Sequence, residues 1–150
     1  MDMALKNDDV PAKLKGFLAD TYVLLAKTQG CHWNARGGNF FGVHKLTEEQ
    51  YEELFKAVDE IAERLRALGE EAPVSLADML GLASLDEAKE VHATEDAVRL
   101  LAGDNRAMAA RAKELALDAD EADDLATHDM LVKRIEVHDK AAWLLESHLG

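Results

Sequence analysis

Hydrophobic residues recur every three or four positions along most of the chain, which is the period of one face of an α-helix. The first such stripe starts near Pro11, a residue suited to the first turn of a helix. Its members are Leu14, Phe17, Leu18, Tyr22, Leu25 and Ala26. A second stripe predicts a helix from about Phe41 to Leu68, and Gly69 followed by Pro73 predicts its end.

The second half of the chain predicts two more long helices. One begins near Thr94, where the hydroxyl offers an N-terminal cap and Glu95 and Asp96 place favourable charge in the first turn. The segment 118–124 holds five acids in seven residues and is expected to be the connection to the last helix. That last helix carries a stripe made of Leu131, Ile135, Ala142, Leu145 and Leu149.

The stretch between Val74 and Glu90 is too irregular for a long helix and predicts one short helix at residues 77–80, bounded by Gly81. Four long amphipathic helices in 150 residues predict a single all-α domain spanning residues 1–150. Its expected architecture is a four-helix bundle with a short extra helix in the crossover between the second and third long helices. Residues 1–10 are expected to form a short N-terminal tail.

The chain is strongly acidic, with 30 Asp and Glu against 17 Lys and Arg and a formal net charge of -13. Such a field repels phosphate and attracts cations, so DNA binding would need a concentrated basic patch. The sequence shows no such patch, and the first ten residues hold only Lys6 against three aspartates. DNA binding is therefore predicted to be weak or absent near neutral pH.

No segment predicts export or insertion into a membrane. The N-terminal stretch lacks a basic-then-apolar signal, and no apolar run approaches the roughly 20 residues of a membrane-spanning helix. The single cysteine, Cys31, excludes a disulfide within the chain and is expected to be a small buried residue. The cytoplasm is the expected compartment.

Two pairs of metal-ligating residues lie on the predicted second helix. His44 and Glu48, like Asp59 and Glu63, are four residues apart and therefore occupy neighbouring turns of one face. At about 100° per residue, all four directions fall within an arc of about 100°. Imidazole and carboxylate ligands without clustered thiolates suit iron, zinc or manganese, and they argue against a structural zinc site.

One helix cannot bring both pairs to one metal ion, because Glu48 and Asp59 lie about 16 Å apart along its axis. An antiparallel second copy can, since His44 with Glu63 and Glu48 with Asp59 share one midpoint, between residues 53 and 54. A two-fold axis there would place each pair opposite the other pair of the partner. Apolar packing around that axis would come from Tyr51, Leu54, Phe55 and Val58. The sequence thus predicts a metal site shared between subunits.

A simpler interpretation of the same residues stays open. Charged pairs four residues apart are common on the solvated face of a helix, and this chain has 30 acids. His32 falls on the buried stripe of the first helix and His138 on that of the last, and each is by itself typical of a hydrogen-bonded core histidine. Trp33 likewise predicts packing rather than chemistry.

The stretch HWNARGGNFFGVHKLTEEQYEELFKAVDEIAERLRALG, residues 32–69, resembles the ferroxidase signature of the Dps family, the miniferritins of the ferritin-like superfamily. It has His-Trp-Asn, a second histidine 12 residues on, an acid four residues later and an ending of Asp-Glu-Ile-Ala-Glu-Arg. THDML and HDKAAWLLESHL near the C-terminus also resemble the closing segment of the family. The resemblance therefore covers most of the chain.

This resemblance implies a ferroxidase that takes His32, His44 and Glu48 from one subunit and Asp59 and Glu63 from its two-fold mate. The family usually has Asp where Glu48 stands, so this ligand is longer by one methylene. The resemblance further implies a hollow dodecamer that oxidises Fe(II), preferentially with hydrogen peroxide, and stores ferric mineral inside. Such chemistry would protect against oxidative stress, because a paired-electron oxidant suppresses the formation of hydroxyl radicals.

Cages of this family admit iron through acidic pores, since a ring of carboxylates concentrates divalent cations. A solvated loop is the favoured explanation for most of the acidic run, but the resemblance makes Asp124 and Asp129, in and after that run, the candidate pore residues.

Other functions predict different features. A true ferritin builds its di-iron centre inside one bundle from Glu-x-x-His motifs, and none of the six histidines here has Glu three residues before it. A DNA-compacting nucleoid protein with little iron chemistry is the main alternative, although many Dps relatives bind DNA through a Lys/Arg-rich tail. A purely structural or partner-binding bundle would show no response to iron.

Overall fold

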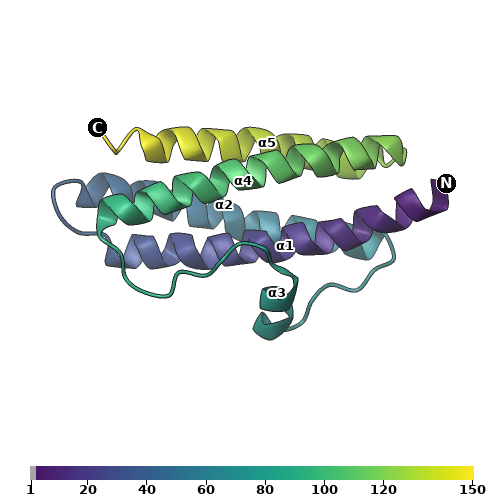
Figure 1. Cartoon of the computed structure of the whole chain (residues 1–150), viewed down its shortest axis with the longest axis horizontal. Coiled ribbons are helices and arrows are strands. Elements are labelled where there is room, and N and C mark those ends of the chain that lie inside the picture. The colour runs from purple at the N-terminus through teal and green to yellow at the C-terminus, as the bar shows by residue number, and fades with distance from the viewer. Residues whose placement is uncertain (1–2) are drawn as a thin grey trace.

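The computed structural model describes residues 3–150, with side chains from Val10 onward. This part of the chain folds into five helices: α1 (Met3–Asn34), α2 (Phe40–Ala67), α3 (Leu76–Leu82), α4 (Thr94–Glu121) and α5 (Leu125–Glu146). The four long helices lie side by side, and the short α3 lies outside them, against α1 (Figure 1). The structure thus confirms the predicted all-α bundle with an extra helix in the crossover. In the described residues, no helix combines the length and the apolar character needed to span a membrane.

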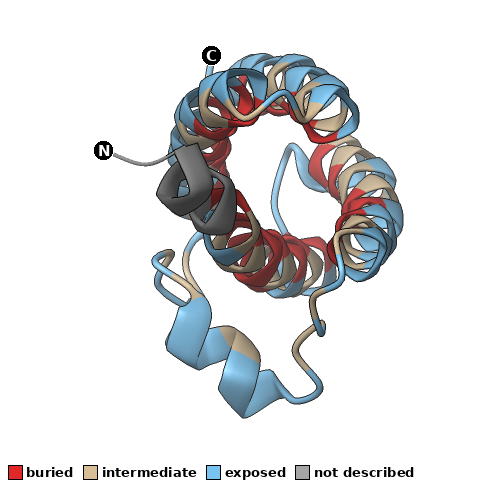
Figure 2. Ribbon diagram, turned by 90° about the vertical axis from the view of Figure 1, so that its right-hand side faces the viewer, coloured by how far each residue is buried: buried red, intermediate tan, exposed pale blue. Residues whose placement is uncertain are grey.

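The core lies between the four long helices, whose buried residues face one another (Figure 2). Its largest fully buried apolar side chains are Leu14, Leu18, Leu24, Val43, Ile61, Leu65, Val98, Leu101, Met108, Leu131 and Leu145. α3 contributes no buried residue. The crossover is fixed instead by Asp20 of α1, which is 1% exposed and accepts hydrogen bonds from the backbone N–H groups of Ser84 and Leu85 and from Arg111 of α4.

α1 begins earlier than the sequence pattern predicts. It starts at Met3, so the expectation that Pro11 occupies the first turn was wrong, and residues 3–10 of the expected tail are helical. Residues 1 and 2 of that tail lie outside the described residues. An internal proline removes one backbone hydrogen bond, but Val10 and Leu14 on either side of it are buried. Packing of these side chains outweighs the local preference, as it does in most protein helices.

The end of α2 agrees with the prediction and has a clear physical cause. Gly69 adopts a φ of 88°, and its N–H donates to the carbonyl of Arg66 at 3.0 Å. The N–H of Glu70 donates to the carbonyl of Leu65 at 3.0 Å, which completes the hydrogen-bond pattern of a Schellman motif. In α3, by contrast, Gly81 lies inside the helix rather than at its boundary.

α4 begins at Thr94, as predicted, but its N-cap and its C-terminal end differ from the prediction. Its N-cap is Ala93, and the Thr94 hydroxyl instead accepts from the backbone N–H of Arg36 at 2.9 Å and donates to the Arg36 carbonyl at 3.0 Å. α4 continues to Glu121, so segment 118–124 is mostly helix and only residues 122–124 connect α4 to α5. The acids stay helical because Ala119, on the opposite face, is fully buried in the core.

Candidate metal site

The turn between α1 and α2 brings two of the predicted ligands into contact. His32, near the end of α1, stacks on His44, in the second turn of α2, with ring centroids 3.8 Å apart and an interplanar angle of 15°. The Nδ1 of His32 lies 2.7 Å from the carbonyl oxygen of His44, and the Nδ1 of His44 lies 2.8 Å from that of His32. The two residues therefore hold each other through a reciprocal pair of hydrogen bonds.

These bonds fix the tautomer of both imidazoles. A carbonyl oxygen can only accept, so each Nδ1 carries the proton and donates it. In the neutral ring, the lone pair then lies on Nε2, which leaves one ligating nitrogen on each histidine. An Nδ1–H bonded to a backbone carbonyl is also the arrangement that orients metal-ligating histidines.

Neighbouring side chains keep this pair in place. His32 is 7% exposed, as its place on the buried stripe predicts, and the Tyr51 ring meets it edge-on with centroids 5.2 Å apart. Phe40 stacks on His44 at 5.0 Å. The fully buried Thr47 hydroxyl donates to the carbonyl of Val43 at 2.7 Å and lies 3.4 Å from the Nδ1 of His32. Sequence analysis did not single out Thr47, because a threonine inside a helix carries no signal of its own.

The three predicted carboxylate ligands are more open to solvent. Glu48 is half-buried and pairs with Lys45 at 3.4 Å, while Asp59 and Glu63 are exposed. The pKa of Glu63 is raised, first by a hydrogen bond with the Asp59 side chain and then by the charge of that carboxylate. Two carboxylates held this close repel each other when both are ionised, and a bound cation would relieve the repulsion.

The structure does not bring all five predicted ligands together. Among the residues that it describes, no three His, Cys, Asp or Glu side chains come close enough to hold a metal ion within one chain. α2 nevertheless runs without a break from Phe40 to Ala67. His44, Glu48, Asp59 and Glu63 therefore keep the common face that the sequence predicts.

The residues expected to pack around a two-fold axis differ in their accessibility. Leu54 is 4% exposed and belongs to the chain's own core, so the expectation that it packs against a partner was wrong. Leu54 lies on the same side of α2 as the buried residues Val43 and Ile61. Phe55 is 68% exposed and Tyr51 and Val58 are half-buried. Trp33, for which packing rather than chemistry was expected, is also 68% exposed.

The two candidate pore residues occupy different environments. Asp124 is the N-cap of α5, accepts from the backbone N–H of Thr127 at 3.1 Å and pairs with Arg64 of α2 at 2.8 Å. Its partial burial would raise its pKa, but the hydrogen bonds from Thr127 and the Arg64 charge outweigh burial and lower the pKa. Asp129 is exposed one turn further along α5.

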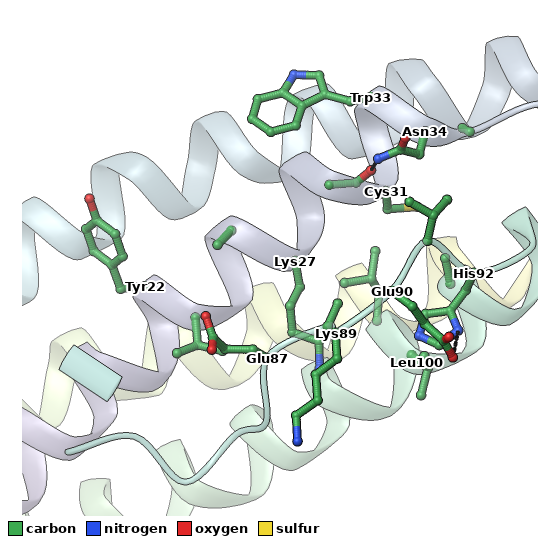
Figure 3. A pocket seen from close by; sticks show the side chains of 18 of the residues that line it. Tyr22, Lys27, Cys31, Trp33, Asn34, Glu87, Lys89, Glu90, His92 and Leu100 are labelled. Carbon is green, nitrogen blue, oxygen red and sulfur yellow. Dashed lines mark hydrogen bonds and ion pairs between the residues drawn. The ribbon is translucent and has the colours of Figure 1, made fainter. Parts of the chain in front are cut away.

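A cavity of about 570 Å³ lies apart from these ligands, between α1, the crossover with α3, and the start of α4 (Figure 3). Cys31 lies on its α1 wall, and Glu90 and His92 of the crossover pair at 3.9 Å. Cys31 is 7% exposed, as expected, and burial raises the pKa of its thiol to about 11. A protonated thiol is a poor nucleophile and metal ligand, so burial makes Cys31 less reactive than an exposed cysteine.

His138 is the remaining buried histidine and is fully enclosed, which confirms the prediction of a core residue. It lies in a polar network with Asn105 of α4, Arg134 of α5 and Glu53 of α2. Sequence analysis missed this network, because an arginine on a polar helix is expected to be exposed. The only signal was the position of Arg134, four residues before His138 on the same stripe.

Comparison with known proteins agrees with this architecture. A ferritin-like domain model matches residues 12–150. The DNA protection during starvation protein of Helicobacter pylori J99 is 34% identical over 138 residues, which are 91% of this chain and 96% of that protein.

Two solved structures superpose on nearly the whole molecule. A Dps protein from Bacillus brevis matches with a TM-score of 0.93 and 33% identity over 100% of both chains. A Dps protein from Vibrio cholerae O1, described as a member of a broad superfamily of ferritin-like diiron-carboxylate proteins, matches with a TM-score of 0.91 and 25% identity, covering 100% of this chain and 94% of that one. With its four-helix bundle, its crossover helix and its paired histidines, this chain belongs to the Dps family of ferritin-like proteins.

Proposed function

We propose that this chain is an iron-storage ferroxidase that oxidises Fe(II) at a site completed by a second copy of itself. The observation that carries this proposal is the division of the ligands. Two imidazoles with fixed tautomers lie at the α1–α2 turn, and a pair of mutually repelling carboxylates lies farther along the same face of α2. Each half offers good ligands for iron, and neither half suffices alone.

An antiparallel second copy of α2 would supply the missing half. In such a pair, His32, His44 and Glu48 of one copy face Asp59 and Glu63 of the other, and the two-fold axis generates two equal sites. Phe55 points in the same direction as the ligands and is 68% exposed, so it provides apolar area at the centre of the contact. Phe41 and Trp33, 70% and 68% exposed, extend this apolar area towards the α1–α2 turn.

The chemistry of the proposed site follows from its ligands. Carboxylates and neutral imidazoles favour Fe(III) over Fe(II), and open positions admit an oxidant. Two Fe(II) ions each give one electron to one molecule of hydrogen peroxide, whose O–O bond breaks. Two protons are taken up, and two Fe(III) ions and two water molecules result. Because the peroxide receives both electrons at one site, no hydroxyl radical is released.

The protein's contribution is to fix the ligands before iron arrives. The reciprocal bonds between His32 and His44 remove the need to choose a tautomer or rotate a ring on binding. Glu48 reaches farther than the aspartate usual at this position, so it can follow a small displacement of the metal.

We further infer that these pairs assemble into a hollow dodecamer in which Fe(III) is stored as a mineral. Family membership supports this inference, and the net charge of -13 favours the accumulation of cations. Asp124 and Asp129 stay the candidates for an acidic entry pore. Of the two, the exposed Asp129 is the more available to passing cations, since Asp124 is paired with Arg64.

The sharing of the site can be tested by mixing two inactive variants. His32→Ala and Asp59→Ala damage opposite halves of each site, so each homodimer has two damaged sites. In a heterodimer, one site carries both defects and the other carries none. Random mixing makes half of the pairs heterodimers, so about a quarter of the wild-type rate of Fe(II) oxidation by peroxide is expected.

A matched control uses two variants that damage the same half. Mixed His32→Ala and His44→Ala chains form no intact site, so their mixture should stay inactive. Equal recovery in both mixtures, or recovery in neither, would exclude the shared site. If the single variants oxidise iron as fast as the wild type, these residues do not form a ferroxidase site.

A further inference from the structure

The interior of the bundle contains a buried positive charge, the guanidinium group of Arg134. Arg134 is 2% exposed, and its guanidinium donates to the Glu53 carboxylate at 2.5 Å and to the Nε2 of His138 at 3.0 Å. Its Nε is buried and has no hydrogen-bond partner among the described residues. A buried charge with an unpaired donor is costly, so a gain in stability alone does not explain why an arginine stands at this position.

Two of the groups that accept from the guanidinium, the Glu53 carboxylate and the His138 imidazole, are of the types that ligate metal ions. His138 donates its Nδ1–H to the Oδ1 of Asn105 at 2.8 Å, which fixes the tautomer with the Nε2 lone pair towards Arg134. Asn105 is fixed in turn by its own bond to the carbonyl of Leu101 at 2.9 Å. A carboxylate oxygen and an imidazole nitrogen thus converge on one cation, and that cation is a guanidinium.

The place of this network in the fold gives it significance. It joins α2, α4 and α5 between the long helices, and ferritin-like bundles with intrachain di-iron centres build them in this interior. The side chain of Glu53 is 37% exposed, so the position is connected to the surface. A divalent cation could therefore reach Glu53 and His138 if nothing occupied the space between them.

We propose that Arg134 takes the place of a metal ion between Glu53 and His138 and thereby excludes divalent cations from the interior of the bundle. Its fixed positive charge repels a metal ion, and its two donors occupy the two groups that would ligate one. The consequence for iron, which is then confined to the face formed by α1 and α2, rests on the proposed function. The exclusion itself does not.

The test measures binding of Co(II) alone and does not depend on iron oxidation. Arg134→Met is introduced into a His32→Ala, Asp59→Ala background, so that any gain arises away from the proposed ferroxidase site. We expect one additional Co(II) per chain by calorimetry, with visible absorption bands of ligated cobalt. Arg134→Lys, which keeps the charge, should gain no site. Adding His138→Gln to the methionine variant should abolish the new site.

A folded Arg134→Met variant that binds no additional Co(II) overturns the proposal, as does a gain that survives His138→Gln. Arg134→Gln repeats the test with a polar neutral side chain if the methionine variant does not fold. If both neutral variants stay unfolded with and without Co(II), Arg134 is a structural cation and the proposal is also overturned. Failure of the proposed function would appear separately, as slow iron oxidation in the otherwise unaltered protein.

Discussion

Histidines in two regions of this molecule are held in nearly the same way but differ in whether Nε2 has a partner within the protein. At the α1–α2 turn and in the bundle interior, each imidazole donates its Nδ1–H to a protein oxygen and has its lone pair on Nε2. In the interior, Nε2 accepts from Arg134. At the turn, no protein donor to either Nε2 is present among the described residues. The difference lies in the cation, which the chain supplies in the interior and which, under the proposed function, iron supplies at the turn.

Residue types alone do not identify metal ligands, because a ligating atom that already accepts a hydrogen bond within the protein is not available to a metal ion. His138, Glu53 and Asn105 form as plausible a group of ligands as His32, His44 and Glu48 when only residue types are considered. In the first group, Arg134 already donates hydrogen bonds to Glu53 and His138, so these two residues are not free to ligate a metal ion. The second group is incomplete within one chain, and in the proposed function a second copy of the chain completes it.

The largest expected effect comes from removing that partner. Phe55→Glu places a charge at the centre of the proposed two-fold contact, where burial without a counter-charge is strongly unfavourable. We expect dissociation of the pair in sedimentation experiments and Fe(II) oxidation close to the rate in buffer, although no ligand has been changed.

Lys56→Gln is the matched control, since it also lowers the net charge by one unit on the neighbouring exposed residue of α2. It points about 100° away from Phe55 and should leave assembly and oxidation unchanged. A Phe55→Glu protein that oxidises iron at the normal rate as a monomer would remove the basis for the shared site.

The interior network predicts a second effect, on stability against acid. Burial, followed by the Arg134 charge, lowers the pKa of His138 to about 3 from an ordinary value of 6.5. Between these values the unfolded chain binds a proton that the folded chain does not, so stability falls as pH decreases from about 6.5 and levels off below 3. The loss amounts to about 3 to 5 kcal/mol.

His138→Gln should remove this part of the pH dependence, because glutamine does not titrate. Urea unfolding at several pH values gives the free energy of unfolding as a function of pH for both proteins. The difference between the two slopes measures the contribution of His138, and the pH-independent cost of the substitution does not affect it. Arg134, Asn105 and the edge of the Phe17 ring face His138 and are unchanged in the variant. Equal slopes would show that folding leaves the pKa of His138 unchanged.

The sequence predicted the long helices and the common face of His44, Glu48, Asp59 and Glu63 on α2, because both depend on periodicity. Residues four apart share a face in any unbroken helix, so His44 and Glu48 could be placed without knowing the packing. Periodicity also identified His32 and His138 as inward-facing. It could not tell them apart, because their partners come from other helices or from backbone carbonyls.

Local composition was a poorer guide where packing overrides it. The acids of segment 118–124 predicted a connection, but Ala119 lies on the core side of α4 and keeps most of the segment helical. Thr94 has the chemistry of an N-cap, yet its hydroxyl is used by the backbone of Arg36. Buried arginines such as Arg134 are rare enough that no sequence pattern predicts them.

A smaller effect separates the two aspartates near the start of α5. Asp124→Asn loses the ion pair with Arg64 and should lower the free energy of unfolding by about 1 kcal/mol. Because the pKa of Asp124 is lowered, its contribution is present above its ordinary pKa of 3.8 and disappears as pH falls further. Asp129→Asn should leave thermal stability unchanged and slow iron uptake about twofold if this exposed carboxylate lines an entry pore. Unchanged uptake kinetics in both variants would exclude the pore.

The last prediction is that the protein does not bind DNA, and it depends on the charge of the whole surface. A surface with a net charge of -13 attracts cations and repels DNA phosphates with the same field, unless basic residues are gathered in one place. Several basic side chains are already engaged within the fold, among them Lys27 with Asp104, Arg64 with Asp124 and Arg106 with Glu146. We therefore expect no saturable gel shift of duplex DNA by the intact assembly near neutral pH, even at low salt. Saturable binding that weakens as salt is added would mean that the acidic surface does not control which ions this protein attracts, and the electrostatic argument for iron accumulation would fail with it.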